Sequence, residues 1–66
     1  MGSLFNKNIK IFEAVAKNDI ETLRSIISKG ADVNARDKNG KTPLSFAINN
    51  GYIKIAELLR QHGATE

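Results

Sequence analysis

An internal period of 33 residues constrains the fold of this chain more than any other feature of its sequence. Shifting the sequence by 33 positions aligns several residues with identical ones: Ala14 with Ala47, Ile20 with Ile53, Gly30 with Gly63, and Ala31 with Ala64. Apolar residues also align with similar ones: Ile11 with Leu44, Val15 with Ile48, and Ile26 with Leu59. Because 66 residues leave room for one small domain, the period predicts the same supersecondary unit twice within it.

The first copy is predicted to contain two short helices. Asn8 is expected to cap a helix over residues 9–17, and Asn18 to end it in the left-handed conformation. The apolar residues of this helix recur at helical spacing: Ile11, Ala14 and Val15. Asp19 should cap a second helix that ends at Gly30. Its apolar stripe is formed by Ile20, Leu23, Ile26 and Ile27.

The second copy follows the same plan with clearer boundaries. Thr42 is a helix cap, and Pro43 stands at the first helical position, where its missing N–H costs nothing. Gly51 should break this helix, and Gly63 should end the next one. The residues expected to face the core are Leu44, Ala47 and Ile48, followed by Ile53, Ile55, Ala56, Leu58 and Leu59.

The segment between the two copies, residues 31–41, has little helical pattern. Asn39-Gly40 favours a two-residue turn with positive backbone angles, which is typical of a β-hairpin. An extended, hairpin-like finger is therefore predicted between the two helix pairs.

Together these motifs resemble ankyrin repeats, a family with this period and a Thr-Pro-Leu-x-x-Ala pattern. The residues that carry the resemblance are Gly30 to Ala35, Asp37, Gly40, Thr42-Pro43-Leu44, Ala47, Gly51, Ile53 to Leu59, and Gly63-Ala64. The resemblance covers roughly residues 9–65. It implies an all-α fold, an ankyrin-repeat solenoid of two helix-turn-helix units joined by a β-hairpin-like finger loop. A single domain over 1–66 is expected, with repeats at about 4–36 and 37–66.

The chain departs from the family pattern at a few positions. Ser45 stands where the family usually has a histidine that ties neighbouring loops together, so that link should be weak or absent. Glu13 takes the place that Phe46 has in the second copy, which favours an outward-facing N-terminal cap. Polar residues in the last turn predict a C-terminal cap: Arg60, Gln61 and His62.

The resemblance implies a protein-protein interaction module rather than an enzyme. Stacked repeats of this kind expose a concave surface formed by the finger tips and the first helix of each unit. Carried over by position, the expected contact residues are Lys17, Asn18, Lys38, Asn39, Lys41, Asn49 and Asn50. Because lysine is cationic and the asparagine amide both donates and accepts hydrogen bonds, we expect a protein partner with an acidic surface.

Catalytic and metal-binding chemistry has little support in the sequence. His62 is the only histidine and there is no cysteine, so a zinc site cannot be assembled. The carboxylates are scattered, without the paired spacing that acid-base catalysis needs, and no glycine-rich phosphate loop occurs. We therefore expect no enzyme activity, no cofactor and no metal.

Two alternatives remain open. A basic helix-turn-helix that binds nucleic acid would use lysines 7, 10, 17, 38 and 41, but the net charge is only +3 and Glu57 offsets the few cations of residues 53–61. Self-association is the other, since two repeats fall below the usual minimum of about three. An open apolar end that supports a homodimer, or belongs to a longer array, is predicted from Phe46, Ile48 and Leu58.

No apolar run approaches the roughly 18 residues of a membrane helix. The first residues also lack the apolar segment of a secretory signal. We expect a protein that is not embedded in a membrane and is either intracellular, in the cytoplasm or nucleus, or a secreted effector.

Overall fold

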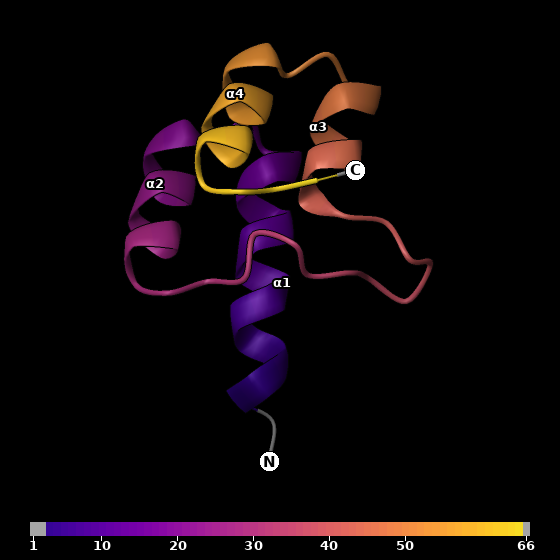
Figure 1. Ribbon diagram of the computed structural model, residues 1–66. Coiled ribbons are helices and arrows are strands. Elements are labelled where there is room, and N and C mark those ends of the chain that lie inside the picture. The colour runs from indigo at the N-terminus through magenta and orange to yellow at the C-terminus, as the bar shows by residue number, and fades with distance from the viewer. Residues whose placement is uncertain (1–2, 66) are drawn as a thin grey trace.

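The computed structural model describes the backbone of residues 3–65 and the side chains of residues 9–65. Within these residues the chain forms four helices and no strand: α1 (Ser3–Ala16), α2 (Ile20–Ser28), α3 (Pro43–Asn49) and α4 (Ile53–Gln61). Helix α1 packs on α2 and α3 packs on α4; α1 also contacts α3, and α2 contacts α4. Figure 1 shows these two helix pairs side by side, with the linker from α2 to α3 crossing in front of α1.

All four helices end with the same pattern of hydrogen bonds. In each case the left-handed residue after the helix donates its N–H to the carbonyl of the residue three positions earlier. The N–H of the next residue donates to the carbonyl five positions before it, as in the Schellman motif. The left-handed residues are Asn18 (φ 54°), Gly30, Gly51 and Gly63. The predicted helix ends are therefore confirmed. Because the bonds of the first pair recur 33 positions later in the second, the two pairs are equivalent residue by residue.

The sequence names a cap residue for three of the four helix starts; two of these caps are present and one prediction is wrong. The Asp19 carboxylate accepts the Thr22 N–H at 3.2 Å, and the Thr42 hydroxyl accepts the Ser45 N–H at 3.1 Å. Helix α4 follows Gly51 as expected. Asn8 is not a cap, because α1 already begins at Ser3. No proline or glycine separates Ser3 from Asn8, so nothing local stops the helix from extending through the asparagine.

The finger, residues 31–41 of the linker between α2 and α3, has the predicted tight turn but not the predicted strands. The Gly40 N–H donates to the Asp37 carbonyl at 2.9 Å, and the Asp37 N–H donates to the Lys41 carbonyl at 3.0 Å. Gly40 has a positive φ of 79°, whereas Asn39 does not, so a turn with two left-handed residues was the wrong prediction. The Asp37 carboxylate explains the difference. Its Oδ1 accepts the N–H groups of Asn39 and Lys41, so the turn is held by a side chain as well as by the backbone.

One apolar core runs through both helix pairs. Its fully buried members include the equivalent residues Ile11 and Leu44, together with Leu23 and Ile55 from the second helix of each pair. Small residues at the equivalent positions Ala14 and Ala47 are buried as well. Burial of equivalent residues in a shared cluster shows that each helix pair covers the apolar side of the other.

Some apolar residues lie elsewhere than the pattern predicts. Ile53, expected to face the core, is 70% exposed. Ile48, which the sequence places both among the core-facing residues and at an open apolar end, is 40% exposed, in agreement with the second of these predictions. Leu58, expected at an open end, is buried, and Phe46 is half-buried against the core. The reason is the direction of stacking: the first helix pair covers Leu58 and Phe46, whereas no described residue covers the opposite side of the second pair.

Asn34 joins the linker to the C-terminal loop. Its side-chain amide donates to the Gly63 carbonyl at 3.2 Å, and its side-chain oxygen accepts the Thr65 N–H at 2.8 Å. The Asn34 N–H in turn donates to the Asp32 carboxylate at 2.9 Å. These bonds connect segments about 30 residues apart in the sequence, so they fix the linker against the end of α4.

We predict that Asn34→Ala lowers the free energy of unfolding by about 1 kcal/mol, because two hydrogen bonds to the C-terminal loop are lost. Urea unfolding followed by circular dichroism measures this change. Asn49→Ala, at an exposed position at the end of α3, is the matched control and should change the free energy by less than about 0.5 kcal/mol. Equal effects of the two substitutions would contradict a structural role for Asn34.

Candidate functional site

A groove lies between α1, the finger and α3. Its eight lining residues are Ile9, Phe12, Glu13, Ala16, Arg36, Asp37, Lys38 and Phe46. Its volume is about 920 Å³, larger than the two other recesses described below. We call these eight residues the central groove.

The floor of the central groove is apolar and in contact with water. Phe12 of α1 and Phe46 of α3 are half-buried, so part of each ring remains accessible. Ile9 is 52% exposed, and Ala16 is exposed at the end of the same helix. Apolar surface that is hollowed and rimmed by polar groups is typical of a binding site.

The rim of the central groove carries charges of both signs. Arg36 and Lys38 come from the finger, Glu13 comes from α1, and Asp37 is held at the base of the turn. Because the Asp37 carboxylate already accepts two backbone N–H groups, its position is fixed by the finger itself. Two basic and two acidic groups leave the rim electrically balanced, so the groove itself does not select for an acidic ligand.

Only one of the seven contact residues expected from the sequence lines the central groove, namely Lys38. Lys17 and Asn18 are exposed at the C-terminal end of α1, and Asn39 and Lys41 are exposed on the finger. At the end of α3, Asn49 and Asn50 are exposed, and the Asn50 side chain donates to the Phe46 carbonyl at 2.9 Å. The central groove therefore does not bring the seven residues together, and their contact with a partner stays a prediction.

The sequence-based prediction missed the apolar floor. Ile9, Phe12 and Ala16 are three and four residues apart, so they form a second apolar stripe on α1 beside the one that enters the core. A helix with two apolar stripes has more apolar surface than one neighbour covers. This excess of apolar surface on α1 is the signal in the sequence that indicates the groove.

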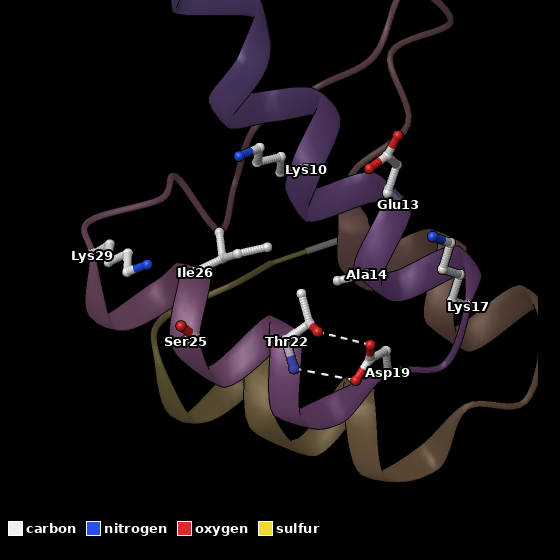
Figure 2. Close-up of a pocket in the computed structure, with 9 residues that line it drawn as sticks. All are labelled: Lys10, Glu13, Ala14, Lys17, Asp19, Thr22, Ser25, Ile26 and Lys29. Atoms are coloured by element: carbon white, nitrogen blue, oxygen red, sulfur yellow. Dashed lines mark hydrogen bonds between the residues drawn. The ribbon is translucent and has the colours of Figure 1, made fainter.

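A second recess, of about 380 Å³, lies on the outer side of α1 and α2 (Figure 2). It is lined mainly by polar and charged side chains: Lys10, Glu13, Lys17, Asp19, Thr22, Ser25 and Lys29, with Ala14 and Ile26. The dashed lines in Figure 2 mark the two bonds between Asp19 and Thr22, of which the hydroxyl bond measures 2.7 Å. The predicted outward-facing N-terminal cap is consistent with this polar surface.

Ser45 occupies the position of the family's loop-tying histidine. Its hydroxyl is buried and has no hydrogen-bond partner among the described residues. Its backbone N–H, by contrast, donates to the Thr42 cap. The serine thus supports the start of α3 through its main chain and makes no side-chain link between loops.

Membrane-spanning and metal-binding features do not occur in the part of the chain that the structure describes. None of its four helices is long and apolar enough to cross a membrane. Within residues 3–65 no three histidine, cysteine, aspartate or glutamate side chains come together as metal ligands would.

Two stacked helix pairs with identical ends, joined by a finger, define a helical repeat protein. The family model for ankyrin repeats (many copies) matches residues 11–60, and the chain belongs to the ankyrin-repeat family. The prediction made from the Thr-Pro-Leu motif and the 33-residue period is thereby confirmed.

Relatives at similar identity differ greatly in size. Two ankyrin repeat proteins of Rickettsia felis are 39% identical over 51 residues, which is 77% of this chain and 81% or 77% of theirs. A potassium channel of rice is 45% identical over 51 residues, but the match spans only 6% of the channel. Protein phosphatase 1 regulatory subunit 27 of the mouse is 39% identical over 54 residues, 35% of its length. Segments similar to this chain thus occur both in small proteins and within large ones.

Asp19 makes the stability of the fold depend on pH. The side-chain hydrogen bond from Thr22, followed by the Thr22 backbone bond, holds the pKa of the Asp19 carboxyl below its ordinary value of 3.8. Folding therefore favours the ionised carboxylate. Its contribution to stability is present above about pH 4 and is lost as the pH falls through the lowered pKa.

We predict that the free energy of unfolding falls more steeply between about pH 5 and about pH 2 in the wild type than in Asp19→Ser. Serine is a good cap that does not titrate in this range, so it retains the helix start and removes the contribution of residue 19 to the pH dependence. Urea unfolding at several pH values measures both slopes. Parallel curves for the two proteins would show that Asp19 does not contribute.

Proposed function

We propose that this chain is a protein-protein interaction module that binds an extended segment of its partner in the central groove. The observation that carries the proposal is the pair of half-buried rings, Phe12 and Phe46, at the floor of an open groove. Ankyrin repeats in general are protein-protein interaction modules and are typically not enzymes.

The groove supports a specific kind of ligand. An apolar side chain of the partner would cover Phe12 and Phe46, since aromatic anchors provide much of the binding energy at protein interfaces. Charged residues on either side of it would meet Arg36 and Lys38 on one edge and Glu13 on the other. We therefore propose a segment with a central apolar residue and flanking charges of both signs.

The seven lysine and asparagine positions fit this proposal as outer contacts. Lys38, Asn39 and Lys41 on the finger would reach the partner beyond the groove, where an acidic surface would favour them. The acidic side chains of the rim, Glu13 and Asp37, disfavour nucleic acid as the ligand, because they would lie against phosphates.

We also propose that the chain forms a single domain, in which the boundary between the two repeats falls near Arg36 and Asp37.

Self-association is the second candidate function, supported by a separate observation. Ile48 and Ile53 are exposed at the end of the second repeat, away from the central groove. This face and the groove share no lining residue, so one chain could use both.

We predict that Ala16→Arg weakens the binding of segments selected from a displayed peptide library by about tenfold or more. Ala16 is exposed and lines the groove, so a long side chain there blocks the site without removing a core contact. Ser28→Arg is the matched control, because it adds the same charge at an exposed position outside the groove and should leave affinity within about twofold.

Fluorescence polarisation of the selected peptides measures both affinities. Equal binding by wild type and Ala16→Arg would rule out the groove as the site, and selection of no peptide by the wild type would contradict the proposal itself. A Lys38/Lys41/Asn49 triple alanine variant then tests the outer contacts. Unchanged affinity in that variant would remove those positions and leave the groove in place.

A further inference from the structure

We propose that a second copy of the chain covers the exposed side of the second repeat, forming a two-fold symmetric dimer through Ile48 and Ile53. We call this side the C-terminal face; it is lined by Ala47, Ile48, Gly51, Tyr52, Ile53, Ala56, Glu57 and Arg60. This inference gives the second candidate function a defined interface and does not depend on the central groove.

The equivalence of the repeats shows that the C-terminal face corresponds to a surface that is covered in the first repeat. Val15 of the first repeat corresponds to Ile48 and is fully buried, whereas Ile48 is 40% exposed. Ile20 corresponds to Ile53 and packs against the core, whereas Ile53 is 70% exposed. The second repeat therefore presents to water a surface that the same fold covers in the first repeat. Covering these two isoleucines is favourable, since it removes apolar surface from water.

The shape of the C-terminal face favours a copy of itself. Ala56 stands where the first repeat has the larger Leu23, and it lines a shallow hollow of about 210 Å³. Ile53 lies beside this hollow and projects more than two thirds of its surface into water. In a two-fold arrangement each Ile53 can enter the hollow of the other copy. The lining also carries one acidic and one basic residue, Glu57 and Arg60, so opposing copies do not bring a net like charge together.

The opposite end of the molecule disfavours the alternative of head-to-tail stacking. In the second repeat, residues that lie buried or half-buried against the first repeat are Pro43, Phe46, Ile55 and Leu58. Their equivalents in the first repeat are Lys10, Glu13, Thr22 and Ser25, all exposed around the recess of Figure 2. Stacking a C-terminal face on that surface would bury charged side chains without a matching set of oppositely charged or hydrogen-bonding groups, which is costly. Contact between two identical C-terminal faces leaves no further apolar end and stops at the dimer.

We predict that the wild type forms dimers with a dissociation constant in roughly the micromolar range, since the contact is small. Sedimentation equilibrium over a range of concentrations measures it. Ile53→Lys should weaken dimerisation by about tenfold or more, and the large exposure of this side chain means that the fold should be retained, as circular dichroism will verify. Ser28→Lys is the matched control, because Ser28 is exposed and lines neither the C-terminal face nor the central groove, so the dissociation constant should be unchanged.

Cysteine crosslinking tests the symmetry, since the chain contains no cysteine of its own. Under mild oxidation Ile53→Cys should form a disulfide-linked dimer, whereas Ser25→Cys, on the opposite end, should not. A wild type that stays monomeric at all accessible concentrations overturns the proposal. So does preferential crosslinking of Ile53→Cys to Ser25→Cys in a mixture, which would indicate head-to-tail stacking. Neither result tests peptide binding in the central groove. That binding is tested separately by Ala16→Arg, at a residue outside the C-terminal face.

Discussion

Packing of one helix pair against the other is the contact on which the rest of the structure depends. Each pair is too small to bury its apolar side alone, and the core exists only because equivalent residues such as Ile11 and Leu44 share one cluster. That packing brings α1 and α3 together, and the finger, whose turn is held by Asp37, lies beside them. The central groove is the space these three elements leave, so the candidate site is a consequence of how the repeats stack.

The two ends of the stack differ in the polarity of their surfaces. The first repeat has polar side chains such as Glu13 and Thr22 exposed on its side away from the second repeat. The second repeat leaves Ile48 and Ile53 exposed, although its last turn is polar as the sequence predicts. One end is thus closed and the other is only partly closed. A partner on the groove and a copy on the C-terminal face would occupy separate surfaces of the same small domain.

Local features of the sequence predicted local structure well, and features that depend on distant contacts were missed. Helix ends at Gly30 and Gly63 and the Thr42 cap follow from the chemistry of single residues, and the structure contains them. The start of α1 was misplaced because asparagine is compatible with both a cap and a helix interior. Burial of Ile53 was mispredicted because it depends on whether a neighbour covers that face. The groove was missed because it depends on where the finger lies relative to α1.

Whether the two helix pairs fold as one unit tests this account most directly. Native-state hydrogen exchange of the amides of α2 and α4 reports the free energy of opening for each pair separately. Ile55→Val, which removes one methylene-sized group from the fully buried side of α4, should lower both opening free energies by about 1 kcal/mol. A loss confined to α3 and α4, with α2 unaffected, would show that the pairs open independently and would contradict a shared core.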